Sequence, residues 1–149
     1  MIVLNTNVLS ELWKPTPEPK VLAWIDAQLV ESLHLSAITV AEVRFGMAAL
    51  PAGKRRTVYQ DRLEREVLPA FKSRVLPFDL DTSQTYAELM ASARAAGQAI
   101  SKEDGYIAAT AVAHGFAVAM RDTSPLEAAG LTVLGKRHDA EGKAMDTVG

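Results

Sequence analysis

Four side chains with oxygen donors stand at comparable places along this sequence. Asn5 and Asp122 each come just after a short apolar run. Glu42 lies about one turn into a predicted helix that follows another apolar run, and Asp104 begins a further predicted helix. The positions of these residues indicate one shared site rather than four unrelated surface groups.

Chemistry at such a site requires a divalent cation. If the apolar runs are parallel strands, their carboxyl ends meet at one edge of the sheet, where ligands bind in open α/β folds. Carboxylate and amide oxygens are the ligands of hard cations, and like charges gathered without a cation repel one another. The pattern therefore predicts a centre for Mg²⁺ or Mn²⁺.

Each of the four residues also has a purely structural interpretation. Glu42 could complete a capping box that starts at Thr39, and Asp104 could complement a helix dipole. Asp122 could form a turn, and Asn5 could cap a helix. Only their joint placement favours a functional site.

Other polar and aromatic residues favour structural roles. Asp81 is expected to cap a helix, and Glu103 is expected to point away from Asp104. The histidines show no paired spacing and predict no metal site; they are His34, His114 and His138. Three large aromatic residues are expected to pack in the core or at an interface: Trp13, Trp24 and Phe45.

Short apolar runs alternate with helical patterns, which predicts an α/β fold with a mainly parallel sheet of about five strands. The strand candidates are Ile2–Leu4, Leu33–Leu35, Val75–Phe78, Phe116–Met120 and Thr132–Leu134. The helix candidates span about 19–29, 40–49, 54–71, 82–96 and 102–114, with a short turn after Ser124-Pro125. Pro69 is expected to kink or end its helix, and Gly97 and Gly115 suit the left-handed positions that end helices.

Composition narrows the class of protein. The 149 residues fit one domain, and 48% apolar residues with 23% charged residues exclude general disorder. There is no cysteine, so disulfides, thiolate metal sites and cysteine nucleophiles are excluded. No apolar run is long enough to cross a bilayer, which predicts a soluble, cytoplasmic protein.

Charge is nearly balanced, at −2 overall, so contacts with an anionic partner must be local. Segment 54–74 has seven basic and three acidic residues, which favours a solvated face with ion pairs such as Asp61–Arg65. Arg44 and Arg121 stand beside the proposed site and are expected to bind substrate. The polar sequence 136–149 predicts a disordered tail after a domain formed by 1–135.

Four motifs resemble those of PIN-domain proteins of the VapC/FitB type, the toxins of bacterial toxin–antitoxin pairs. The motifs are MIVLNTNVLSEL, LSAITVAEVRFGM, ISKEDGYIAATAVAHG and VAMRDTSPLEAAGLTVL. The resemblance implies a PIN-like α/β fold whose acidic residues bind Mg²⁺ or Mn²⁺ and activate water to cut RNA. It assigns the acidic set to Asn5, Glu42, Asp104 and Asp122, with support from the hydroxyl of Thr6.

The resemblance also implies partners. These are an RNA substrate, an antitoxin that inserts a segment near the acidic pocket, a homodimer, and a larger assembly on DNA through the antitoxin. Apolar residues expected to remain on helix surfaces, including Leu12, Trp13 and Trp24, are consistent with a dimer.

One position departs from the family pattern. The motif that reads Asp-Thr-Asn in the family begins here with Asn5. An amide offers one neutral oxygen and cannot bind a cation bidentately, so an inactive or weakened nuclease is expected. The sequence is compatible with a deliberate substitution and with natural variation.

Two other functions remain open at this stage. A receiver-type signalling domain would use Asp79 after the third strand and Lys136 after the fifth, but it lacks the acidic pair expected after the first strand. A PIN-like module that has lost its metal could bind a partner without catalysis, and Asn5 is consistent with that alternative.

Overall fold

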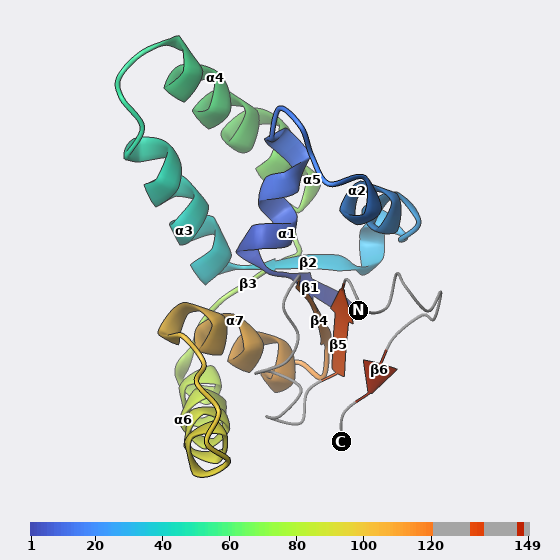
Figure 1. Ribbon diagram of the computed structural model, residues 1–149, viewed down its shortest axis with the longest axis vertical. Coiled ribbons are helices and arrows are strands. Elements are labelled where there is room, and N and C mark those ends of the chain that lie inside the picture. The colour runs from blue at the N-terminus through green and yellow to red at the C-terminus, as the bar shows by residue number, and fades with distance from the viewer. Residues whose placement is uncertain (121–131, 136–145, 148–149) are drawn as a thin grey trace.

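A computed structural model describes residues 1–120, 132–135 and 146–147, in which one sheet separates two layers of helices (Figure 1). The strand order is β3-β2-β1-β4-β5-β6; β1 to β5 are parallel, and β6 is antiparallel to β5. The strands are β1 (Ile2–Leu4), β2 (Leu33–Ser36), β3 (Val75–Leu76), β4 (Ala117–Met120), β5 (Thr132–Gly135) and β6 (Asp146–Thr147). The predicted α/β class and the five parallel strands are confirmed.

The helices divide between the two faces of the sheet. On one face lie α1 (Thr6–Ser10), η1 (Glu11–Trp13), α2 (Pro19–Asp26), α3 (Ala37–Ala48), α4 (Lys54–Arg62), the π-helical turn η3 (Leu63–Val67) and α5 (Leu68–Ala70). On the other face lie α6 (Leu80–Ala95) and α7 (Lys102–Ala113), and a 3-10 turn, η2 (Val30–Ser32), leads into β2. No helix among the described residues is long and apolar enough to span a membrane.

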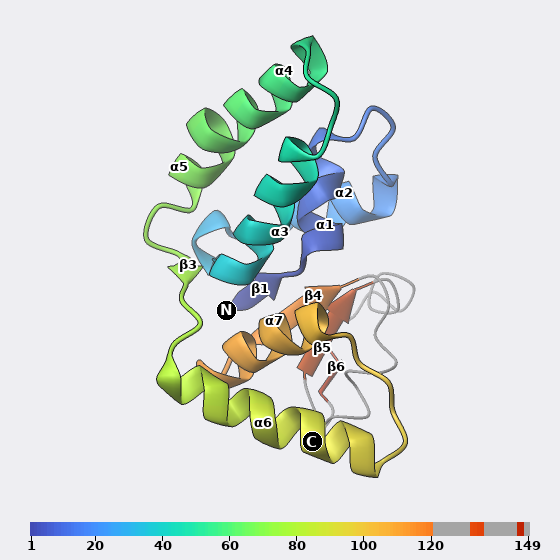
Figure 2. The ribbon, with the colours of Figure 1, turned by 90° about the vertical axis from the view of Figure 1, so that its left-hand side faces the viewer.

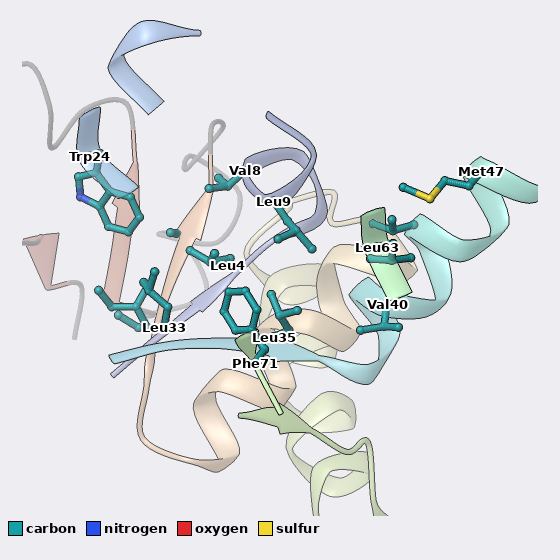
Figure 3. Packing of buried hydrophobic residues seen from close by; sticks show 14 residues of the cluster. Leu4, Val8, Leu9, Trp24, Leu33, Leu35, Val40, Met47, Leu63 and Phe71 are labelled. Atoms are coloured by element: carbon teal, nitrogen blue, oxygen red, sulfur yellow. The ribbon is translucent and has the colours of Figure 1, made fainter. Parts of the chain in front are cut away.

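Alternation along the strands builds two hydrophobic cores. In β1, Ile2 and Leu4 join the larger core beneath α1 to α5, whereas Val3 joins the smaller core beneath α6 and α7. The strand β4 divides its side chains between the cores in the same way. Leu4, Leu9 and Leu35 lie at the centre of the larger core (Figure 3). Because both faces of β1 and β4 are buried, the end of β1 is fixed in place.

The helices α3 and α4 form a hairpin that extends beyond the sheet (Figure 2). Pro69 follows the π-helical turn η3, in which the backbone N–H of Leu68 bonds to the carbonyl of Leu63. A proline has no N–H and clashes with the carbonyl four residues earlier, so the wider turn accommodates it. The helical segment continues through Pro69 to Ala70, so Pro69 does not end it; the π turn precedes the proline, and the predicted kink stays a prediction.

Several boundaries differ from the sequence prediction. The helix α1, which follows β1 directly, was not predicted. The strand β3 ends at Leu76 because Pro77 offers no N–H to the ladder. Gly97 and Gly115 have φ values of 73° and 70°, as predicted. The predicted turn after Ser124-Pro125 lies outside the described residues.

The tail and two of the aromatic residues also differ in part from what the sequence predicted. Within the tail that was predicted to be disordered, β6 forms a short strand against β5. Trp24 is 7% exposed and packs in the larger core, so it is not available as an apolar surface for a dimer. Trp13 is partly buried against the same core, and Leu12 is exposed.

Candidate active site

A cleft of about 400 Å³ opens at the carboxyl end of β1, between the first turns of α1 and α7 and the side of α3. It lies where the strand order reverses direction around β1 and β4, the position at which open α/β sheets bind ligands. Its lining residues are Asn5, Thr6, Asn7, Glu42, Phe45, Ser101, Glu103 and Asp104. Three of the four predicted acidic-set positions, from distant parts of the chain, therefore line one cleft.

Asn5 is held at the end of β1 by both its backbone and its side chain. Its backbone N–H donates to the carbonyl of Ala119 in β4 at 3.0 Å. Its side-chain oxygen accepts from the backbone N–H of Val8 at 2.9 Å and caps α1. Asn5 is 3% exposed, so its orientation is fixed by these bonds. The structural interpretation of Asn5 as a helix cap is correct, and Asn5 lines the cleft as well.

Glu42 reaches the cleft from the second turn of α3. The helix begins at Ala37, and its cap is Ser36, whose hydroxyl accepts from the backbone N–H of Thr39 at 3.0 Å. The proposed capping box from Thr39 to Glu42 is therefore absent. The Thr6 hydroxyl donates to a carboxylate oxygen of Glu42 at 2.6 Å, a short charge-assisted bond that fixes this side chain.

Asp104 lies in the first turn of α7, three residues after the cap residue Ser101. The hydroxyl of Ser101 accepts from the backbone N–H of Asp104 at 3.1 Å. Glu103 also lines the cleft, so the expectation that it points elsewhere is wrong. A helix rotates about 100° per residue, and the open first turn lets two successive side chains border one wide cleft.

The first turn of α7 rests closely on α6. A Cβ placed on Gly105 would lie 2.7 Å from the sulfur of Met90 and 3.1 Å from Tyr86. The ring of Tyr86 stacks on that of Tyr106 with centroids 4.6 Å apart. Burial, with a further contribution from Tyr106, raises the pKa of Tyr86. The close contact at Gly105 therefore fixes the position, relative to α6, of the α7 turn that carries Glu103 and Asp104.

Of the two arginines that were expected to bind substrate, only Arg44 lies among the described residues. Arg44 does not line the cleft; from α3 it forms two hydrogen bonds, of 2.8 and 3.0 Å, to Glu64 in the π-helical turn η3. This pairing lowers the pKa of the Glu64 carboxyl and raises that of Arg44. Arg121, like Asp122, lies outside the described residues, and so do His138 and Lys136. Substrate contact by Arg44 stays a prediction that requires this pair to open.

The basic segment is partly neutralised. Arg65 lies 3.4 Å from Asp61, as predicted, and Arg62 lies 3.6 Å from Glu66. Within residues 1–120, Lys54 and Arg55 have no carboxylate at ion-pair distance. The same holds for Arg56, Lys72 and Arg74, so unpaired positive charge lies at both ends of this segment.

Histidine and aspartate roles elsewhere are structural. His114 is the cap residue at the end of α7, and His34 is buried against the ring of Phe116 at 4.8 Å between centroids. Asp79, not Asp81, caps α6 by accepting from the N–H and the hydroxyl of Thr82, which lowers the pKa of Asp79.

The electrostatics of the cleft suit a cation. Glu42, Glu103 and Asp104 contribute carboxylates, and no described lining residue is basic. Oxygen donors of this kind match Mg²⁺ or Mn²⁺. Within residues 1–120, however, no three acidic or histidine side chains are grouped closely enough to hold a metal by themselves. The donor chemistry fits, with Asn5 supplying a neutral oxygen in place of a charged one.

Sequence reasoning missed four cleft residues: Asn7, Phe45, Ser101 and Glu103. Ser101 could have been found as the residue three before Asp104, the spacing of a helix cap. Phe45 was expected to pack in the core or at an interface; it is 75% exposed on the cleft wall, so it is not part of the core.

Comparison with known proteins decides the family. A family model for the PIN domain matches residues 2–131. The chain belongs to the PIN-domain family. Its VapC/FitB type is shown by high identity to a VapC ribonuclease and to a FitB toxin. VapC ribonuclease Y4jK of Sinorhizobium fredii is 71% identical, over 90% of this chain and 96% of that protein. Toxin FitB of Neisseria gonorrhoeae is 47% identical, over 93% of this chain and all of that protein.

Solved structures agree with this PIN-domain assignment. The structure of FitAB bound to a DNA fragment matches with a TM-score of 0.87 and 46% identity, over 91% of this chain and 94% of that one. The PIN match excludes the receiver-type alternative, and Asp79, which that alternative required, is instead bound to α6 as its cap.

Proposed function

We propose that this PIN domain is a divalent-metal-dependent endoribonuclease and the toxin of a toxin–antitoxin pair. The observation that carries the proposal is the cleft itself, which brings Asn5, Glu42 and Asp104 together from three separate segments. The close relatives named as a ribonuclease and as a toxin support it.

Four of the cleft residues have a role in the proposed reaction: Asn5, Thr6, Glu42 and Asp104. Asp104 and Glu42 would hold Mg²⁺ or Mn²⁺, with Asp122 completing the anionic set. A bound cation would polarise the scissile phosphate and lower the pKa of a water molecule. The Thr6 hydroxyl keeps Glu42 in one orientation, so that its second oxygen can face the cation or the attacking water. Asn5 would contribute one amide oxygen, which it shares with the N–H of Val8.

We further propose that Asn5 weakens the enzyme. An amide at this place removes one negative charge from the cleft and so lowers cation affinity. The backbone is ready for the charged residue, since aspartate caps a helix as well as asparagine does. Asn5→Asp should therefore restore activity without a change in fold.

The proposed partners follow from the family type. They are RNA, a cognate antitoxin and a second copy of this chain, with assembly on DNA through the antitoxin. FitAB, a solved relative, is bound to a DNA fragment, which supports the last of these. RNA phosphates would be met by the free cations Lys54 and Arg55, by Arg121, and by Arg44 once it leaves Glu64.

A growth assay in bacteria tests the toxin role. Induced expression of the Asn5→Asp form should arrest growth, and the unchanged chain should not. Asp104→Asn in the Asn5→Asp background should relieve the arrest, whereas the matched change Asp26→Asn, on the exposed side of α2, should not. Normal growth with abundant, folded Asn5→Asp protein would reject the toxin role.

A non-catalytic binding module is the second candidate, because the Asn5 side chain has a structural bond to Val8 that needs no cation. It predicts no gain of cation affinity in the Asn5→Asp form. Calorimetric titration with Mn²⁺ separates the two candidates.

A further inference from the structure

The wall of the acidic cleft contains one large apolar side chain that the proposed chemistry does not use. Phe45 lies on α3, three residues after Glu42, and so on the same side of the helix one turn further along. It lines the cleft together with Glu42, and 75% of its surface is exposed. No described ring packs against it. Its ring is therefore available to a ligand.

The charges around Phe45 restrict what this ligand can present to it. Glu42, Glu103 and Asp104 line the same cleft, and no described basic residue does. A phosphate away from the cation is repelled there, whereas the neutral face of a nucleobase is not. Bases stack on aromatic side chains whatever their identity, because every base has a π-face.

Base pairing decides which RNA can use this contact. In a duplex both faces of each base are covered by its neighbours, and single-stranded RNA can turn a base outward onto an aromatic ring. The cleft volume of about 400 Å³ is within the range of small-ligand sites, so a nucleotide is a suitable occupant.

We propose that Phe45 stacks on a nucleobase next to the phosphate that is cut, and so selects unpaired RNA. This inference rests on the proposed ribonuclease function and names a specificity residue for it. Phe45 acts on the substrate directly, while the carboxylates act on the cation.

Binding measurements with matched variants test the proposal. The unchanged chain, in Mg²⁺, is titrated with several defined single-stranded RNAs of about twenty nucleotides, and with the same RNAs each annealed to its exact complement. The RNA length is checked on a gel afterwards. The variants are Phe45→Ala, Phe45→Leu and Phe45→Tyr, with Leu80→Ala as a control because Leu80 is 86% exposed and outside the cleft.

The expected results follow from stacking. Single strands should bind more tightly than duplexes. Phe45→Ala should weaken single-strand binding roughly five- to a hundredfold, the effect of losing one base–aromatic stack. Phe45→Leu should weaken it nearly as much, whereas Phe45→Tyr and Leu80→Ala should bind like the unchanged chain. Exposed positions of this kind leave stability almost unchanged, which a melting curve confirms.

Four results would overturn the inference: no RNA binding by the unchanged chain, equal binding of duplex, full affinity in Phe45→Ala, or full affinity in Phe45→Leu. A change of mass in Phe45→Ala by light scattering, with RNA binding unaltered, would assign the ring to a protein partner instead. Cleavage separates the two proposals. If the Asn5→Asp form cuts single-stranded RNA and Phe45→Ala in that background leaves kcat/KM unchanged, the inference fails and the nuclease function stands.

Discussion

Asn5 occupies a position where an amide and a carboxylate differ in charge while their shapes match. Its oxygen caps α1, a bond that either side chain can make. Its surroundings are buried, and Glu42 and Asp104 line the same cleft. A negative charge at position 5 therefore destabilises the folded protein in the absence of a cation and favours cation binding when one is present.

The thermal stability of the Asn5→Asp form should reveal this coupling. In EDTA the Tm of the Asn5→Asp form should lie several degrees below that of the unchanged chain, since burying an unpaired carboxylate costs roughly 1–3 kcal/mol. Addition of Mg²⁺ should raise the Tm, because ligands that bind only the folded state stabilise it. The unchanged chain should respond much less. Scanning calorimetry with and without Mg²⁺ gives the result, and an equal response of both proteins would contradict the role of position 5.

The hydroxyl of Thr6 should control how well Glu42 binds the cation. Thr6→Val keeps the shape of the side chain and removes the 2.6 Å bond, so Mn²⁺ affinity in the Asn5→Asp background should fall about tenfold or more. Thr6→Ser retains the hydroxyl and should remain close to the parent. Unaltered affinity in Thr6→Val would show that Glu42 needs no such support.

At the residue scale, the types and spacing of Asn5, Glu42 and Asp104 were enough to predict that they meet. Their positions depend on strand ends, which the sequence marks well. Glu103 and Phe45 could not be assigned to the cleft, because side-chain direction on a helix depends on where the helix starts and how it is tilted against the sheet.

At the element scale, hydroxyl caps position the two helices that carry Glu42 and Asp104. Ser36 starts α3 and Ser101 starts α7, so each cap fixes the turn or turns that carry a cleft carboxylate. The helix α1 was missed because its five residues are too few for a helical pattern. It is stable because Asn5 caps it and because Val8 and Leu9 are buried, which are tertiary effects.

Removal of the Ser101 cap should weaken both stability and the site. Ser101→Ala should cost about 1 kcal/mol, and fraying of the first turn of α7 should reduce cation affinity as well. Ser101→Asn keeps a capping oxygen and should behave like the parent. Urea unfolding and Mn²⁺ titration measure the two effects. Loss of stability in both variants alike would show that the hydroxyl does not act as a cap.

At the scale of the whole molecule, the two cores hold β1 and β4 from both sides, and the cleft lies at their shared end. The sequence predicted this architecture because alternating strands and helices allow few parallel arrangements. It did not predict the division of the helices between the two faces, since the order of strands in the sheet decides that division.

His34 should make the stability of the molecule depend on pH. It is buried in β2 against Phe116, and burial lowers its pKa below the usual 6.5. The unfolded chain therefore binds a proton at a higher pH than the folded chain does, so stability should fall as pH decreases through 6.5. His34→Gln should flatten this part of the profile. Urea unfolding between about pH 5 and 8 tests it, and an identical slope in both proteins would exclude His34 as the source.

The most direct test of the account is an RNA-cleavage assay of the unchanged chain beside its Asn5→Asp form. Each is incubated with a mixture of cellular RNAs in Mg²⁺, in Mn²⁺ and in EDTA, with Asp104→Asn in the Asn5→Asp background as the inactive control. The account predicts cleavage by the Asn5→Asp form with either cation, none in EDTA, and weak or no cleavage by the unchanged chain. Absence of cleavage by a folded Asn5→Asp form that also fails to bind Mn²⁺ would contradict it.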